Sequence, residues 1–164
     1  MKQKRERKQV DAALEPGCLM GPKIHPTLQN YAGYCLSKAA MRGRSLVDSE
    51  LKAYGVVAPQ YGILSMLANV GSMTQVELGG YMAIDKATMV RMLDGLEELG
   101  YLKRVAQAED RRSKKLVLTK KGETTLVKMS AARNRAEEAF FGILTDKERE
   151  ALRAITRKLL QIGD

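Results

Sequence analysis

The segment from Tyr101 to Gly122 constrains the fold of this 164-residue chain more than any other stretch. An apolar strand start at Tyr101 and Leu102 runs into a charged tip, and an apolar stretch at 116–118 leads out again, which is the pattern of a β-hairpin. Eight cations stand here against only two carboxylates, so the hairpin carries a net +6 of the chain's +9. A small hairpin cannot stabilise itself with that much like charge, so we expect it to face a polyanion, with the DNA duplex backbone as the leading candidate. The cations are Lys103, Arg104, Arg111, Arg112, Lys114, Lys115, Lys120 and Lys121.

Composition favours a mainly helical globule. The apolar content of 45% is enough for the core of one domain, and the aromatic content of 5% without any Trp favours helices packed on helices over a β-sandwich. The longest uncharged stretch, 54–76, is broken by Pro59 and by glycines, so no membrane span is predicted. The basic N-terminus has no apolar core of the kind that a signal peptide requires. We therefore expect a cytoplasmic protein with no membrane partner.

The residues of metal and catalytic sites are scarce. Two cysteines, Cys18 and Cys35, lack the spacing of a zinc site, and the single His25 cannot complete one. The sequence also has no phosphate-binding glycine loop and no nucleophile elbow. We expect no metal, no cofactor and no enzymatic activity. A pI near 9.6 points instead toward nucleic acid or an anionic surface.

The first 22 residues are predicted to form an N-terminal extension, because a basic run is followed by turn-forming residues. One interpretation is a solvated, flexible tail. The other is an arm that reaches along a nucleic-acid backbone. The rest of the chain, 23–164, is predicted to form one folded domain.

Capping residues and helical spacing predict the helices. Thr74 and Glu77 match the capping box, and the short helix that they open is expected to be interrupted at Gly79 and Gly80. Asp85 can cap the next helix, which is expected to run from Lys86 to about Leu99. The other predicted helices are 28–54, ended by Gly55; 60–68, after Pro59; 119–141; and a last one opened by a second capping box, Thr145 with Glu148.

From Thr74 onward the predicted order is helix, turn, helix, β-hairpin. A helix-turn-helix followed by a two-stranded hairpin is a winged helix, in which the second helix enters the major groove and the hairpin, or wing, reaches the backbone or the minor groove. The predicted fold class is therefore mainly α with a small β-hairpin wing.

These residues resemble the MarR family of bacterial and archaeal transcriptional regulators over about residues 28–162. The resemblance implies an obligate homodimer in which terminal helices, about 28–54 and 119–162, dimerise around a winged helix-turn-helix at about 58–118. It also implies binding to double-stranded DNA at a pseudo-palindromic operator, and regulation by a small ligand or by oxidation. The segments that carry the resemblance are Thr74–Leu78, Thr88, Arg91, Leu96–Arg104, Asp110–Arg112 and Leu118–Gly122.

The resemblance assigns DNA contacts to both parts of the winged helix. Thr88 can bond a phosphate or a base edge, and Arg91 can pair with guanine or clamp a phosphate. Arg112 is similar to a wing-tip arginine that enters a narrow minor groove, with Asp110 as its brace. Surface residues without a DNA role remain the alternative for Thr88 and for the wing lysines. The predicted DNA-binding residues are Thr74, Gln75, Lys86, Ala87, Thr88, Arg91, Arg111, Arg112, Lys114 and Lys115.

The family resemblance further implies a ligand crevice between the dimerisation helices and the winged helix. Tyr31, Tyr34 and Tyr61 are candidates to line it for a small aromatic or phenolic effector, and ordinary core packing is the alternative. The expected function is that of a repressor released by the ligand. Two alternatives stay open: a winged-helix protein-interaction module, and a thiol-based redox sensor that uses Cys35.

Overall fold

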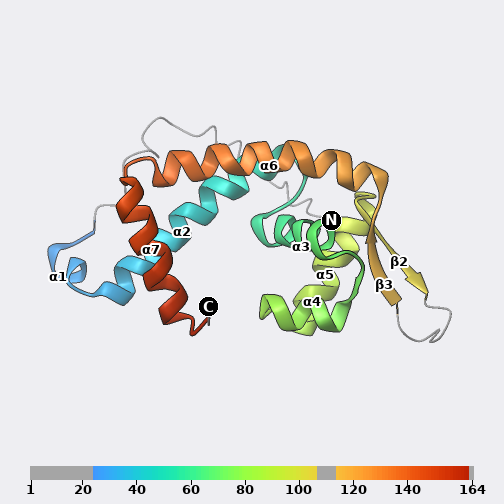
Figure 1. Cartoon of the computed structure of the whole chain (residues 1–164), viewed down its shortest axis with the longest axis horizontal. Helices are drawn as coiled ribbons and strands as arrows, with labels where there is room; N and C mark the ends of the chain where they lie inside the picture. Colours follow the sequence, from blue (N-terminus) through green and yellow to red (C-terminus); the bar gives the residue numbers. More distant parts are fainter. Residues whose placement is uncertain (1–23, 107–113, 163–164) are drawn as a thin grey trace, which may run out of the picture. The chain divides into compact units, whose positions relative to one another are not determined.

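The computed structural model describes residues 24–106 and 114–162. The chain divides into two compact units, 1–38 and 39–164. Most of the described chain is helical and it holds a small antiparallel sheet (Figure 1), which confirms the predicted fold class. The elements are α1 (Pro26–Gln29), α2 (Ala32–Leu51), a 3-10 turn (Lys52–Tyr54), α3 (Ala58–Val70), β1 (Met73–Thr74), α4 (Gln75–Met82), α5 (Lys86–Glu98), β2 (Leu102–Ala106), β3 (Lys114–Leu118), α6 (Lys120–Phe141) and α7 (Asp146–Leu159).

The prediction of one helix over 28–54 is wrong at its start. Helix α1 ends at Gln29, and the backbone N–H groups of Asn30 and Tyr31 both turn back to the carbonyl of Leu28, so the helical ladder breaks before α2. Asn is a weak helix former, and Gly33 weakens the first turn of α2. The predicted end at Gly55 is confirmed, because this residue adopts the left-handed conformation with φ 73° and closes the 3-10 turn.

The later helices begin at the predicted caps. The Thr74 hydroxyl accepts from the backbone N–H of Glu77, and the Asp85 carboxylate accepts from that of Thr88. The second capping box, Thr145 with Glu148, opens α7. These starts could be predicted because a cap is a contact between residues only three positions apart.

The expected interruption at Gly79 and Gly80 is wrong. Helix α4 continues through both glycines to Met82 and then ends at Ala83, which takes the left-handed conformation with φ 49°. Close packing does not account for Gly80, since a Cβ built there would meet no atom within 4 Å. A side chain could therefore be accommodated at this position.

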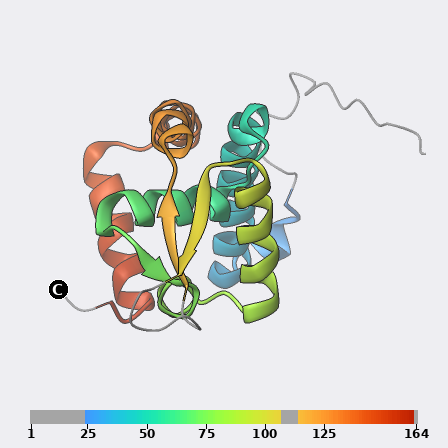
Figure 2. The ribbon, with the colours of Figure 1, turned by 90° about the vertical axis from the view of Figure 1, so that its right-hand side faces the viewer.

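The predicted hairpin is confirmed in strands β2 and β3, and a third strand joins it. The sheet order is β1-β3-β2, with Met73 opposite Leu116 on one side of β3 and Arg104 opposite Leu116 on the other. Strand β1 has only two residues and was not predicted. In Figure 2 α5 lies alongside β2, and α4 is seen end-on below the strands.

Leucine and methionine side chains form the core of unit 39–164. Helix α5 buries Met89, Leu93 and Leu96, and Leu99 at its C-terminal end is half-buried. Strands β2 and β3 contribute Leu102 and Leu116 to the same cluster. The core therefore holds α5 against the sheet. Its most deeply buried members are Leu51, Ile63, Leu64, Leu78, Met89, Leu93, Leu96, Leu102, Leu116 and Met129.

Acid is expected to weaken both capping boxes. The backbone N–H and the hydroxyl of Thr74 donate to Glu77, and those of Thr145 donate to Glu148, which holds the pKa of each carboxyl below its ordinary value. A lowered folded pKa gives stability that is present above about pH 4.3, the ordinary glutamate pKa, and that is lost as the pH falls through the folded value. The variant Glu77→Gln/Glu148→Gln keeps an acceptor oxygen that does not titrate. Its Tm should fall less steeply than that of the wild type between about pH 5 and pH 3. Thermal melts at constant ionic strength measure this, and equal slopes would contradict it.

Candidate nucleic-acid interface

The N-terminal part of α5 carries the predicted DNA-facing residues on its surface. Lys86, Ala87 and Arg91 are exposed, and Thr88 is half-buried. The backbone N–H of Thr88 donates to Asp85 at 2.9 Å, which holds the pKa of Asp85 below its ordinary value and keeps the cap charged. The Arg91 guanidinium donates to the Thr88 hydroxyl at 3.0 Å. The structure therefore brings Thr88 and Arg91 together on the surface of α5.

The start of α4 lies beside this surface. Gln75 and Lys86 line the same hollow of about 280 Å³, which is otherwise apolar. Thr74 forms the predicted capping box, because its hydroxyl donates to Glu77 Oε2 at 2.9 Å and accepts the Glu77 N–H, and its DNA contact stays a prediction. Its hydroxyl is engaged in capping α4.

The sheet brings the wing to the helix-turn-helix. Lys115 pairs with Thr74 across the β1–β3 ladder, so a wing lysine lies at the N-terminus of α4. Its charge adds a small part to the lowering of the Glu77 pKa, after the two bonds from Thr74. Lys114 is exposed and pairs with Ala106 at the outer end of the hairpin. The predicted contacts Arg111 and Arg112, with Asp110, lie outside the described residues.

Part of the hairpin charge is engaged inside the protein, which sequence reasoning missed. The Arg104 guanidinium donates to Asp94 and Glu97. Burial lowers the pKa of Arg104, but the two carboxylates have the larger combined effect, so its pKa is raised above the ordinary value. Lys121 Nζ donates to the Leu99 carbonyl at 2.7 Å and lies over the Tyr101 ring. Lys120 pairs with Glu123. Lys120 and Lys121 nevertheless stay exposed, as do Lys103 and Lys114, and Lys115 is half-buried. Among the described hairpin cations, Arg104 is the one whose side chain is drawn largely into the protein.

The predicted effector residues fall in different units. In unit 1–38, Tyr31 is exposed, and the Lys38 ammonium lies 5.4 Å from the centre of the Tyr34 ring. In unit 39–164, the Tyr61 hydroxyl lies 3.2 Å from the Ser130 hydroxyl. Ser130 also lines a hollow of about 510 Å³ between α3, β3 and α6. The Cys35 thiol is half-buried and lies 3.4 Å from the Gln29 carbonyl.

Neither a metal site nor a membrane-spanning helix is found among the described residues. Among the residues that the structure describes, no group of His, Cys, Asp or Glu side chains could hold a metal ion. No helix in the described ranges is both long and apolar enough to cross a bilayer.

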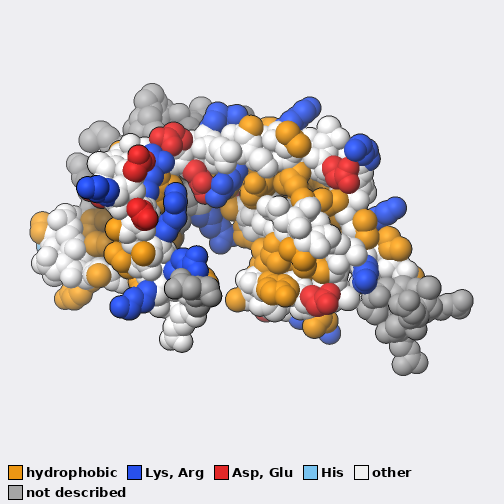
Figure 3. Space-filling model, in the orientation of Figure 1, with side chains coloured by type: hydrophobic (Ala, Val, Ile, Leu, Met, Phe, Trp, Pro, Cys, Tyr) orange, Lys and Arg blue, Asp and Glu red, His pale blue; other side chains and the backbone are white. Residues whose placement is uncertain are grey.

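Hydrophobic side chains gather over α3 and α4 on the face seen in Figure 3, and Val70, Val76 and Tyr81 are highly exposed on these helices.

Comparisons with known proteins find a matching family model and similar transcriptional regulators. Residues 57–114 match the sequence model described as the MarR family. The chain is 32% identical over 114 residues to the uncharacterized HTH-type transcriptional regulator YwoH of Bacillus subtilis (strain 168), covering 70% of this chain and 82% of YwoH. It is 30% identical over 125 residues to the HTH-type transcriptional regulator PrsX of Escherichia coli, covering 75% of each. These relatives are regulators, not enzymes.

A solved structure extends the comparison to a DNA complex. The transcriptional repressor CouR, bound to a 23-mer DNA duplex, is similar to this chain with a TM-score of 0.78 at 26% sequence identity. The similarity covers 85% of this chain and 99% of the CouR chain.

Proposed function

Because this chain belongs to the MarR family of transcriptional regulators, we propose that it is a homodimeric repressor that binds a pseudo-palindromic operator and is released by a small ligand. The observation that carries this proposal is the β1–β3 pairing, which sets Lys115 of the wing beside the N-terminus of α4. Gln75 and Lys86 continue that surface onto α5. A basic wing and a polar helix face thus lie together, as a winged helix on DNA requires.

The two parts of this surface have different tasks. Arg91 offers a planar guanidinium for a guanine edge or a phosphate, and Thr88 offers a hydroxyl on the same helical turn. Lys114 and Lys115 supply point charges for phosphates. The helix would therefore read sequence, while the wing would add affinity that depends on salt. Arg111 and Arg112 belong to the same wing in sequence and keep their predicted role as tip contacts.

A dimer is supported by apolar side chains on α7. Ile155 is 56% exposed and Leu159 is 64% exposed, and Leu160 and Ile162 follow at 69% and 54%. A monomer rarely leaves so many large apolar side chains together in water. A second copy of this chain would cover them.

An effector is supported by the hollow between α3, β3 and α6. Its lining is largely apolar, with Leu67, Leu118 and Leu126, and Ser130 adds a polar group. Tyr61 lies next to Ser130, so an aromatic or phenolic ligand would find an apolar surface and hydroxyl partners. Tyr31 and Tyr34 keep their predicted role as further contacts, and Cys35 remains the candidate for the redox alternative.

Footprinting on genomic fragments tests the function directly. We expect the purified protein to protect an inverted repeat, and its affinity to fall steeply with salt because several phosphate contacts release counterions. Gel filtration of the same sample should give the mass of a dimer. A monomer that protects no palindrome would favour the protein-interaction alternative, for which the exposed Val76 and Tyr81 on α4 would be the natural surface.

A further inference from the structure

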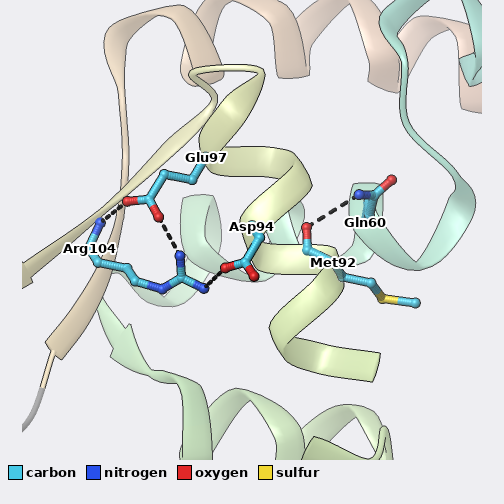
Figure 4. A network of polar contacts seen from close by, with 5 residues as sticks. All are labelled: Gln60, Met92, Asp94, Glu97 and Arg104. Atoms are coloured by element: carbon cyan, nitrogen blue, oxygen red, sulfur yellow. Dashed lines mark hydrogen bonds and ion pairs between the residues drawn. The ribbon is translucent and has the colours of Figure 1, made fainter. Parts of the chain in front are cut away.

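A polar network joins strand β2 to the C-terminal half of α5 (Figure 4). Arg104 Nη2 donates to Asp94 Oδ1 at 2.7 Å, and Nη1 donates to Glu97 Oε2. The backbone N–H of Arg104 also donates to Glu97 Oε1 at 3.1 Å. One carboxylate thus accepts from both the main chain and the side chain of the same residue. The Arg104 side chain is only 20% exposed, whereas the Asp94 and Glu97 side chains are 51% and 38% exposed, so the carboxylates stay in contact with solvent.

Asp94 and Glu97 continue the row that carries the DNA-facing residues. Thr88, Arg91, Asp94 and Glu97 follow one another at intervals of three, which places neighbours on one side of a helix. Arg91 lies as close in sequence to Asp94 as to Thr88, its partner in the structure. An unpaired carboxylate at Asp94 would repel phosphates and would compete for the Arg91 guanidinium. Arg104 occupies both carboxylates.

The same residue connects the wing to a rigid part of the fold. Arg104 lies opposite Leu116, which is 1% exposed and also pairs with Met73 on β1. On the side of α3, Gln60 accepts from the Val57 N–H and donates to the Met92 carbonyl of α5 at 3.3 Å. Helix α5 is therefore tied to α3 by Gln60 and to the wing by Arg104.

We propose that Arg104 is a positioning residue for DNA binding, which holds the wing against α5, engages Asp94 and Glu97 and cancels one of their two negative charges, so that Arg91 is left for DNA. This inference rests on the proposed function. It differs from a direct phosphate contact by Arg104, and from an ion pair that only stabilises the fold. Each of the three predicts a different response when the two carboxylates are removed together with Arg104.

Operator affinity measured at several salt concentrations separates these roles. Arg104→Ala should weaken operator binding about tenfold. This factor corresponds to the middle of the range of interaction energies between residues of one polar network. The triple variant Arg104→Ala/Asp94→Asn/Glu97→Gln should recover about threefold, because the uncompensated carboxylates are gone. Arg104→Lys should lie between the wild type and Arg104→Ala, since it keeps the charge and loses the two-pronged bond. No recovery in the triple variant would overturn the proposal.

Lys103→Ala is the matched comparison. It also removes one cation from β2, but adjacent residues of a strand point to opposite faces, so it leaves the network intact. If Lys103 contacts phosphate, its loss should reduce the slope of log affinity against log salt by about one. Arg104→Ala should keep the wild-type slope. A reduced slope for Arg104→Ala without recovery in the triple variant would identify a direct phosphate contact instead.

Hydrogen exchange without DNA tests the positioning by itself. Amides of 102–106 should exchange faster in Arg104→Ala than in the wild type, while those of α3 and α6 keep their protection. Unchanged exchange in β2 would overturn the positioning role. A wild-type chain that binds no duplex would overturn the proposed function, and the exchange result would still decide whether Arg104 holds the wing.

Discussion

Replacing Gly122 by alanine will lower the free energy of unfolding by about 3 kcal/mol or more, at the upper end of the range for overpacking. A Cβ at this position would lie 2.0 Å from the carbonyl oxygen of Tyr101 and 2.9 Å from its carbonyl carbon. Both atoms belong to the backbone and cannot rotate away. The same oxygen accepts from the Thr119 N–H at 3.0 Å, and Thr119 caps α6 at the Gly122 N–H. The methyl group therefore forces apart the base of the hairpin and the start of α6.

Gly80→Ala is the matched control for this substitution. Gly80 lies inside α4, and a Cβ there would meet no atom within 4 Å. Alanine should therefore stabilise the protein by about 1 kcal/mol, the difference in helix propensity between the two residues. Chemical denaturation of the three proteins measures both effects. If Gly122→Ala unfolds at the same denaturant concentration as the wild type, α6 does not approach the Tyr101 backbone as closely as described.

The features that could be predicted from the sequence depend on contacts between near neighbours. The capping boxes at Thr74 and Thr145 need only residues three positions apart, and Gly55 and Gly100 end their elements by local left-handed turns. The hairpin could be predicted because apolar strand residues lie on either side of a charged tip. The break between α1 and α2 is also local, but Asn30 and Gly33 only weaken a helix, so their effect depends on the competing turn at Leu28.

The features that were missed depend on partners far away in the sequence. Strand β1 has two residues, too few to show an alternation of apolar and polar side chains. It forms because Met73 pairs with Leu116 across the sheet. The cations of the hairpin look alike in sequence, yet Arg104 pairs with α5 and Lys121 with the Leu99 carbonyl. A spacing of three between Asp94 and Glu97, followed by Arg104, was the available signal. It becomes meaningful only once β2 is known to return along α5.

Replacing Ile155 by glutamate will convert the proposed dimer to a monomer and weaken operator binding by about 100-fold or more, because two linked half-sites gain at least that factor over one. Ile155 is 56% exposed in the single chain, so the variant should keep the fold of its subunit. In a symmetric dimer the substitution occurs twice, and each carboxylate would lose water at an apolar interface.

Ala154→Glu provides the control for charge. Ala154 is also exposed on α7, but at 3.6 residues per turn it lies on the side opposite to Leu152 and Leu159. This variant adds the same carboxylate and should remain a dimer with wild-type affinity. Sedimentation velocity gives the mass of each protein, and operator titration gives its affinity. A dimeric Ile155→Glu protein with undiminished affinity would place the interface elsewhere. A monomer with undiminished affinity would show that one winged helix is sufficient, and the pseudo-palindromic operator would then have to be abandoned.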